Sequence, residues 1–449
     1  MRKVFVKEEL ETFERNRPKS KKLWEKAVKV LPGGISHNIR TFGLTALGGF
    51  PVIIKSAMGP YLTDIDENKY LDFWNGHFAM ILGHNHPKIQ EVIREHVSYG
   101  WHFGTNTKYQ IELAARLIDD NPGVEKVRFC TSGTEATMYA TRLARAYTKR
   151  RLVAKAVMGW HGPSDTLCYD VGGLVDGKAP LGQLNAEDAG IITFEINNDK
   201  AFDIIRKNSA DLAAIILEPL LGGGGGFPVN IDFLTRLREE TEKAGILLIF
   251  DEVITGYRFR DSLFQNELKI YPDLTTMGKI IGGGLPIGAI GGKEEIIERS
   301  SPQNDNQVLI GGGTFSGYPL SMIAGLETLN LLKDSQQNYS RINDEGNNLR
   351  NLLNQFFYEE KLPMLAIGYK SMIMLHIMSK WIENPSFKEI IEYKDKKREA
   401  LLQLAIFNRK ISGLHGLGAL SMVNTHDHMI QILDAFKEIS RPVSNSSMK

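Results

Sequence analysis

Lys279 and Asp251 are the residues of this sequence whose types and settings point most directly to chemistry. Asp251 ends the apolar run Ile246-Leu247-Leu248-Ile249-Phe250, and Lys279 stands among glycines in Met277-Gly278-Lys279-Ile280-Ile281-Gly282-Gly283-Gly284. A pyridoxal phosphate (PLP) enzyme needs an amine for a Schiff base and an acid that keeps the pyridine nitrogen protonated. A strand that delivers the carboxylate, followed by a lysine whose glycine neighbours allow a flat ligand to approach, meets both needs.

The run Ser132-Gly133-Thr134 is the third element of this chemistry. It follows the apolar segment Val127-Arg128-Phe129-Cys130 and precedes a predicted helix that starts at Glu135. Hydroxyl and backbone N–H groups at the positive end of a helix are suited to holding a phosphate. Taken alone, this run is more typical of a helix N-cap, Asp251 of a strand-end cap and Lys279 of a solvated charge. Together the three favour a PLP site.

Two other motifs suggest different chemistry and are weaker. The run Gly172-Gly173-Leu174-Val175-Asp176-Gly177-Lys178 has the spacing of a nucleotide-binding P-loop. However, Ala179 and Pro180 follow it, where a magnesium-binding Ser or Thr is required. His84-Asn85-His86 resembles a metal-ligand pair, but Gly83 and Pro87 bracket it as a turn. A nucleotide hydrolase and a metal site are therefore disfavoured, and a nicotinamide site is disfavoured because the chain has no G-x-G-x-x-G motif.

Composition limits the class of partner. The 449 residues carry 54 basic and 53 acidic side chains, so no global field attracts nucleic acid or an anionic membrane. No apolar run is long enough to span a bilayer, and the first ten residues lack the apolar core of a secretory signal, so we expect a cytoplasmic protein. The two cysteines are too few for a disulfide framework or a thiolate zinc site. The expected partners are small molecules.

The pattern of elements predicts an α/β architecture. Strand candidates alternate with helical stretches in the middle of the chain, which is typical of a parallel sheet with binding groups at the carboxyl ends of its strands. The predicted strands are 127–130, 152–157, 213–217 and 246–250, and the predicted helices include 87–99, 109–119, 135–147 and 231–243. The opening to about Lys29 has the spacing of one amphipathic helix.

The pattern changes after about Lys333. A long polar helix, 339–360, is followed by a strand near 372–377, a helix near 396–408, a strand near 417–422 and a closing helix, 426–440. This order predicts a separate α+β domain. We therefore expect a large PLP-binding domain at 76–333 and a smaller domain made of 334–449 together with the N-terminal segment 1–75.

The combined motifs resemble those of class III PLP-dependent aminotransferases, within which the group around glutamate-1-semialdehyde 2,1-aminomutase is most similar. The resemblance covers roughly Leu31 to Phe436 and implies a fold type I PLP-transferase. It rests on these runs: Thr131-Ser132-Gly133-Thr134-Glu135-Ala136, Trp160-His161-Gly162, Leu217-Glu218-Pro219, Phe250-Asp251-Glu252-Val253-Ile254-Thr255-Gly256-Tyr257-Arg258, Gly278-Lys279-Ile280-Ile281-Gly282-Gly283-Gly284-Leu285-Pro286 and Gly313-Thr314-Phe315-Ser316-Gly317.

The resemblance implies a role for each matching residue. Lys279 would carry the Schiff base and move the proton, and Asp251 would pair with the pyridine nitrogen. Ser132, Gly133 and Thr134 would hold the phosphate, while Trp160, where the group usually has tyrosine, and Val253 would cover the two ring faces. His161 and Glu218 would complete the cofactor pocket. Thr314 would reach the phosphate of a neighbouring subunit, because family members are homodimers with sites built across the interface.

The substrate is less well defined by the resemblance. Arg40 matches an arginine that holds the substrate carboxylate, a natural role for a guanidinium group. Pro163 replaces a histidine of the aminomutase, and Tyr318 replaces an asparagine. The run Gly413-Leu414-His415-Gly416-Leu417-Gly418-Ala419-Leu420-Ser421-Met422 is more similar to aminotransferases that act on β-amino acids and D-arylglycines, some of which have an arginine at the position of His415.

These departures favour an intermolecular aminotransferase over an aminomutase. We expect transfer of an amino group between a carboxylate-bearing amino acid, which is β-, D- or aromatic, and a 2-oxo acid. The alternatives are glutamate-1-semialdehyde 2,1-aminomutase, which makes 5-aminolevulinate, and, more remotely, a non-enzymatic binding protein that keeps the PLP fold. We expect Arg40 and His415 to contact the substrate and no metal to take part.

Overall fold

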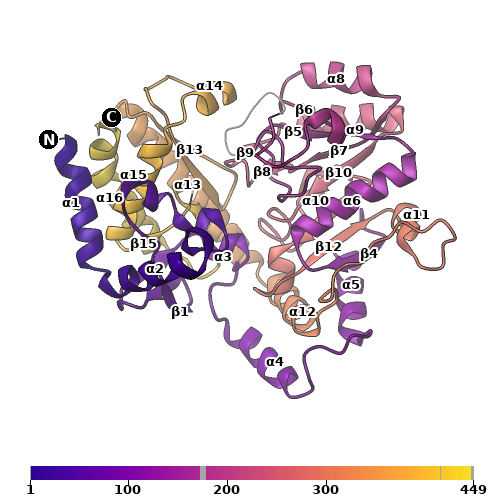
Figure 1. Cartoon of the computed structure of the whole chain (residues 1–449), viewed down its shortest axis with the longest axis horizontal. Coiled ribbons are helices and arrows are strands. Elements are labelled where there is room, and N and C mark those ends of the chain that lie inside the picture. Colours follow the sequence, from indigo (N-terminus) through magenta and orange to yellow (C-terminus); the bar gives the residue numbers. More distant parts are fainter. Residues whose placement is uncertain (1, 172–177, 415, 446–449) are drawn as a thin grey trace. The chain divides into compact units, whose positions relative to one another are not determined.

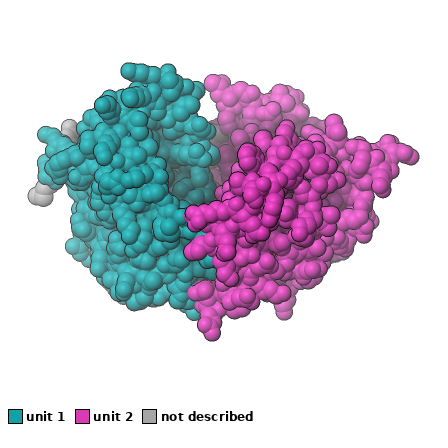
Figure 2. Space-filling view, turned by 90° about the horizontal axis from the view of Figure 1, so that it is seen from below, with its two compact units in different colours: residues 1–86, 340–449 teal, residues 87–339 magenta. Residues whose placement is uncertain are grey.

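The computed structural model describes residues 2–171, 178–414 and 416–445, and the chain forms two compact units. Unit 1 consists of Met1–His86 and Ser340–Lys449, and unit 2 of Pro87–Tyr339. Figure 2 shows the residues of unit 1 in teal and those of unit 2 in magenta. The domain boundaries expected from the sequence, at residues 75 and 333, stay a prediction.

Unit 2 is built on a seven-stranded sheet that is mostly parallel (Figure 1). In spatial order its strands are β4 (Lys126–Cys130), β12 (Gly288–Gly292), β11 (Leu274–Gly278), β10 (Leu247–Asp251), β7 (Leu212–Leu217), β5 (Leu152–Ala156) and β6 (Ile191–Phe194). Strand β12 runs antiparallel to both of its neighbours, and the other recorded pairings are parallel. The predicted α/β class is confirmed, and the strands predicted near 127, 152, 213 and 246 are present.

Helices pack on this sheet because they place one apolar face against it. Helix α6 (Gly133–Thr148) buries Ala140, Leu143 and Ala144 in a cluster with strand residues such as Ile216 and Ile249. The other helices of this unit are α4 (Pro87–Val97), α5 (Lys108–Asp119), α7 (Ala186–Ala189), α8 (Lys200–Asn208), α9 (Ile231–Ala244), α10 (Gln265–Leu268), α11 (Glu294–Ile297) and α12 (Pro319–Lys333). Short elements complete it: the β8 (Leu220–Leu221) and β9 (Phe227–Pro228) hairpin, η4 (Lys279–Gly282) and η5 (Glu298–Ser300).

Unit 1 combines the N-terminal segment with the C-terminal part of the chain. Its larger sheet has the order β1 (Ile54–Met58), β2 (Tyr61–Asp64), β3 (Lys69–Asp72) and β15 (Ile411–Ser412), and its smaller sheet the order β13 (Met364–Ile367), β14 (Met372–Ile377) and β16 (Gly418–Ala419). The helices are α1 (Arg2–Arg15), α2 (Pro18–Val30), α3 (Asn75–Phe78), α14 (Phe387–Glu392), α15 (Lys396–Asn408), α16 (His426–Asn445) and most of α13 (Gln336–Glu359), with 3-10 turns η1 (Pro32–Gly34), η2 (Asn38–Thr41) and η3 (Leu44–Leu47). The strand pairing of β15 with β3 joins segments from the two ends of the chain.

The N-terminal segment corrects one prediction. The single amphipathic helix expected up to Lys29 is two helices, α1 and α2, which break at Arg17. Pro18 starts the second helix, where its missing N–H is tolerated. The fully buried Arg17 guanidinium donates to the Tyr70 hydroxyl at 2.8 Å and to the Phe407 carbonyl at 2.7 Å. The break between the helices therefore places the buried Arg17 guanidinium where it donates hydrogen bonds to residues from distant parts of the chain.

The length and hydropathy of the helices decide whether any of them could cross a membrane. Within residues 2–171, 178–414 and 416–445, no helix is both long enough and apolar enough to cross a membrane. The cytoplasmic location stays a prediction.

Candidate active site

The predicted cofactor residues lie where parallel strands of unit 2 end. Because the carboxyl ends of parallel strands meet at one edge of a sheet, residues distant in sequence are gathered there. Ser132 to Thr134 follow β4, and Trp160 and His161 follow β5. Glu218 follows β7 and Lys279 follows β11, while Asp251 is the last residue of β10. In the parallel register Asp251 faces Thr276 of β11, three residues before Lys279.

Asp251 is buried and fully engaged. Its carboxylate, in a residue only 4% exposed, accepts hydrogen bonds from His161 Nδ1 at 2.7 Å, Thr276 Oγ1 at 3.0 Å and the backbone N–H of Val253 at 3.1 Å. Three donors satisfy the acceptor oxygens of this buried carboxylate. The carboxylate is therefore held in one orientation.

His161 supplies the shortest of these three hydrogen bonds. Burial lowers the pKa of its imidazole below the ordinary value, although Asp251 acts in the opposite direction, so the ring is neutral near pH 7. A carboxylate only accepts hydrogen bonds, which assigns the ring proton to Nδ1. The other nitrogen, Nε2, is buried without a hydrogen-bond partner in the described part of the chain. The backbone carbonyl of His161 accepts from Thr137 Oγ1 at 2.6 Å, which ties this turn to α6.

Lys279 has an unusual backbone for its type. Its φ of 51° lies in the left-handed region, and such conformations in residues other than glycine concentrate at functional sites. Burial lowers the pKa of its amine, whereas the Asp251 and Glu218 carboxylates act to raise it. The amine is thus less basic than that of a surface lysine, which favours the uncharged nucleophilic form.

Glu218 links the segment that contains Trp160 to the glycine turn that contains Gly223. One carboxylate oxygen accepts the backbone N–H of Trp160 at 3.0 Å, and the other accepts that of Gly223 at 3.0 Å. The residue is 2% exposed, and burial, reinforced by Asp251, raises the pKa of its carboxyl to about 8. Its geometry is that of a clamp on backbone rather than that of a group directed at a ligand.

The start of α6 offers donors for an anion. Ser132 is the N-cap of α6, and its hydroxyl accepts the N–H of Glu135 at 3.3 Å. This run therefore does cap the helix, as its residue types allow. The backbone N–H groups of Gly133 and Thr134 have no acceptor among the described residues. Unpaired N–H groups at the N-terminus of a 16-residue helix are the usual cradle of a phosphate.

Glycines bring the pieces of the site into contact. A Cβ added to Gly133 would lie 2.9 Å from Val253 Cγ1, and one added to Gly278 would lie 3.3 Å from the same atom. A Cβ added to Gly162 would lie 2.3 Å from Thr134 Oγ1. Val253 therefore packs between the helix start and the strand that leads to Lys279, and the Trp160 turn packs on the helix start.

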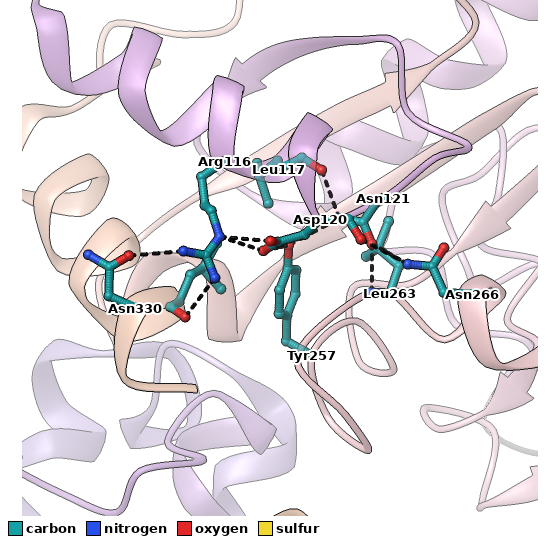
Figure 3. Close-up of polar contacts among 9 residues, drawn as sticks. Arg116, Leu117, Asp120, Asn121, Tyr257, Leu263, Asn266 and Asn330 are labelled. Atoms are coloured by element: carbon teal, nitrogen blue, oxygen red, sulfur yellow. Dashed lines mark hydrogen bonds and ion pairs between the residues drawn. The ribbon is translucent and has the colours of Figure 1, made fainter. Parts of the chain in front are cut away.

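The loop after Asp251 is anchored from α5 and the residues that follow it (Figure 3). Asp120 accepts Arg116 Nε at 2.7 Å and the Tyr257 hydroxyl at 3.1 Å, and Asn121 Oδ1 accepts the N–H of Leu263 at 2.8 Å. Glu252, next to Asp251, accepts the N–H of Gln265 at 2.9 Å. These contacts tie residues 252–265, which follow Asp251 and include Val253, to α5 and Asn121 and to Glu252.

Three predicted residues remain to be located. Thr314 is exposed in unit 2 and lines a hollow of about 790 Å³ together with His102 and Tyr318. Arg40 is exposed in η2 of unit 1. His415 and the P-loop-like run at 172–177 lie outside the described residues.

His84, in the turn whose two histidines resemble metal ligands, has a partner within the protein. His84 Nε2 contacts the buried Asp72 carboxylate at 2.8 Å, which gives the ring a structural partner. Among the described residues, no group of His, Cys, Asp and Glu side chains could hold a metal ion.

Sequence reasoning missed two participants. Thr276, which bonds to Asp251, shows no signal until strand register is known. Gly223, whose N–H Glu218 accepts, belongs to a run of five glycines, which is the one sequence signal for this contact.

The fold and these groups define a fold type I PLP-transferase. The family model of the class-III aminotransferases matches residues 46–362, and the chain belongs to this family. The predicted family, PLP cofactor and enzymatic nature are thereby confirmed.

Similar proteins include both reaction types. Glutamate-1-semialdehyde 2,1-aminomutase 2 of Lachnoclostridium phytofermentans is 40% identical over 356 residues, which are 78% of this chain and 82% of that protein. The crystal structure of an omega-transaminase from Sphaerobacter thermophilus matches with a TM-score of 0.85 and 30% identity, covering 94% of this chain and 97% of the other. A beta-phenylalanine aminotransferase from Variovorax paradoxus matches with a TM-score of 0.85 and 26% identity, covering 98% and 97%.

Proposed function

We propose that the chain transfers an amino group between a carboxylate-bearing amino acid and a 2-oxo acid, with Lys279 as the residue that holds PLP covalently and Asp251 as the partner of its pyridine nitrogen. The observation that carries this proposal is the buried Asp251 carboxylate, held by His161 and Thr276 on the strand beside the one that leads to Lys279. PLP, when bound, acts as an electron sink for charge at the substrate carbon. A negative Asp251 favours the protonated ring nitrogen that this requires.

The other residues near Asp251 fit the remaining parts of the cofactor. The free N–H groups of Gly133 and Thr134, with the Ser132 and Thr134 hydroxyls, would hold the phosphate. Val253 would cover one ring face and the Trp160 indole, which is 39% exposed, the other. Glu218 and His161 would support the pocket from behind. The lowered pKa of Lys279 favours the uncharged amine, which can accept and return a proton.

Arg40 is the proposed carboxylate contact of the substrate. Its side chain is exposed, and its neighbour His37 has a pKa lowered by partial burial and by Arg40 itself, so Arg40 is the cation of this turn near pH 7. A guanidinium group binds a carboxylate through two parallel hydrogen bonds. His415 remains the proposed contact of the substrate side chain, from the sequence resemblance.

A second candidate is intramolecular transfer, as in glutamate-1-semialdehyde 2,1-aminomutase. The 40% identity to the Lachnoclostridium enzyme favours it. The replacement of a family histidine by Pro163, together with the run at 413–422, favours the intermolecular reaction.

We also propose a homodimer with shared sites. Large apolar side chains beside the hollow that Thr314 lines are exposed in the single chain: Phe103 by 47%, Ile111 by 67% and Phe315 by 53%. An apolar surface of this kind is typical of a protein interface. A second copy that covers it would bring Thr314 toward the phosphate of its partner.

A labelling experiment tests the cofactor assignment. Purified protein incubated with PLP and reduced with borohydride should carry the label on Lys279, the lysine that follows β11, next to the strand that ends at Asp251. Lys293→Ala is the control, because Lys293 lies on the surface and pairs with Asp273. A label on another lysine, or none, would contradict the proposal.

A donor screen tests the reaction. Amino donors are assayed with pyruvate and 2-oxoglutarate, and glutamate-1-semialdehyde is supplied alone in parallel. We expect donor-dependent transfer, with Arg40→Ala raising KM for acidic donors about tenfold or more, and leaving 1-phenylethylamine nearly unchanged. Rapid isomerisation of glutamate-1-semialdehyde without a donor would establish the second candidate instead.

A further inference from the structure

The five glycines at 222–226 form the turn between β8 and β9, four residues after Glu218. Gly225 and Gly226 have φ angles of 112° and 83°, in the region that favours glycine. Gly222, Gly223 and Gly224 do not have positive φ. Backbone conformation therefore does not explain why these three positions lack a side chain.

Close packing explains why residues 222, 223 and 224 are glycines. A Cβ added to Gly223 would lie 2.5 Å from Trp160 Cβ, and one added to Gly224 would lie 2.7 Å from the Met158 carbonyl oxygen. One added to Gly222 would lie 2.8 Å from Ile254 Cγ2, in the loop after Asp251. Since real Cβ contacts are essentially never shorter than 3.0 Å, the turn and the Trp160 segment approach as closely as two backbones can.

Glu218 fixes this approach. Its two carboxylate oxygens accept the N–H groups of Trp160 and Gly223, each at 3.0 Å, so one buried group holds both sides of the contact. The next residue, His161, is bonded to Asp251 at 2.7 Å. A displacement of Trp160 therefore strains the hydrogen bond that orients the catalytic carboxylate.

We propose that Gly223 is a positioning residue that sets, together with Glu218, the place of the Trp160 indole against the PLP ring. This inference rests on the proposed function, in which Trp160 covers one ring face. A methyl group at residue 223 must push Trp160 away by about 1 Å to reach ordinary contact distance, or break the Glu218 clamp. Either change moves the indole and the adjoining His161 relative to the cofactor.

A double-mutant cycle tests the inference with Gly223→Ala, Trp160→Gly and the double variant. Trp160→Gly removes the Cβ that the new methyl group would meet. The readouts are the dissociation constant of PLP, titrated into cofactor-free protein, and the visible circular dichroism of the bound cofactor. We expect Gly223→Ala to weaken PLP binding about tenfold when Trp160 is present and less than about twofold when residue 160 is glycine, because contacting residues couple by this amount.

Gly123→Ala is the matched control. Its added Cβ would lie 2.8 Å from Tyr271 Cδ1, a comparable contact with an aromatic side chain, but Tyr271 is 41% exposed and can turn away. PLP binding should not change in this variant. If Gly223→Ala does not accumulate as folded protein, Glu218→Gln replaces it, since it loosens the clamp without adding volume and should weaken binding in the same direction.

The outcomes are distinct. An unchanged dissociation constant in Gly223→Ala, or an equal loss with and without the Trp160 side chain, overturns the inference while leaving the proposed function intact. Wild-type protein that binds no PLP contradicts the proposed function, and the inference falls with it.

Discussion

Glu218 is a buried side chain whose contacts in the candidate active site are with the backbone. Its carboxyl group has two backbone N–H partners and sits close enough to Asp251 and Lys279 for their charges to act on it. The pKa near 8 means that the group binds a proton more tightly in the folded cofactor-free protein than in the unfolded chain, where its ordinary value is 4.5. Stability must then depend on pH through this residue.

We expect the protonated Glu218 to contribute stability that is complete below pH 4.5 and is lost as the pH rises through 8. Glu218→Gln does not titrate. The free energy of unfolding of cofactor-free wild type should therefore fall relative to this variant between pH 5 and pH 8, by on the order of a few kcal/mol. Chemical denaturation at several pH values measures it.

Glu239→Gln, at a carboxylate that is 60% exposed, is the control and should show no such pH-dependent difference. A constant difference between wild type and Glu218→Gln across this range would mean that the Glu218 carboxyl titrates normally.

At the scale of elements, the loop at 252–265 is as important as the strands. It connects β10 to α10 and starts directly after Asp251, yet hydrogen bonds from α5 and Asn121 set its shape. Tyr257 sits in this loop with a φ of 58°, fully buried, and its hydroxyl donates to Asp120 and accepts from Asn121 Nδ2 at 3.1 Å. A strained backbone conformation is kept because surrounding hydrogen bonds hold it.

Tyr257→Phe should lower the free energy of unfolding by about 1–2 kcal/mol, because it removes a buried hydroxyl that bonds to the partly buried Asp120 and to the buried Asn121. Tyr358→Phe is the matched control: its hydroxyl also donates to a carboxylate, that of Glu383, but the residue is 56% exposed and the loss should stay within about 0.5 kcal/mol. Chemical denaturation of both variants compares them. Equal losses would show that the buried network does not stabilise the loop.

At the scale of the whole molecule, the proposed dimer makes Thr314 part of a different chain's site from Lys279. Lys279→Ala and Thr314→Asp should each be inactive alone, the first without its amine and the second through repulsion of the phosphate. After subunit exchange, half of the dimers are mixed, and each mixed dimer contains one site with both native residues. We therefore expect an equal mixture to recover about a quarter of wild-type activity.

Native mass spectrometry shows whether mixed dimers have formed. Mixed dimers that remain inactive would mean that Thr314 serves the site of its own chain or none. A monomeric wild-type protein would contradict the dimer itself.

Much of unit 2 follows from local pattern. The apolar run at 246–250 predicts the strand that the structure has as β10, and Ser132 predicts the start of α6, because burial of a strand and capping of a helix depend on neighbouring residues. The break at Arg17 and the strand β12 were not predicted. Arg17 acts through Tyr70 and Phe407, far along the chain, and Gly-Ala-Ile-Gly-Gly lacks the residue types that mark a strand.

The sequence by itself determined the family and the chemical types at the site: a lysine among glycines, a carboxylate at a strand end and hydroxyls at a helix start. Tertiary structure alone decided that His161 and Thr276 hold Asp251, and that Gly223 lies under Trp160. The physical reason is that motif residues are contiguous and leave a local pattern, whereas these contacts join strands whose register and order no local pattern encodes.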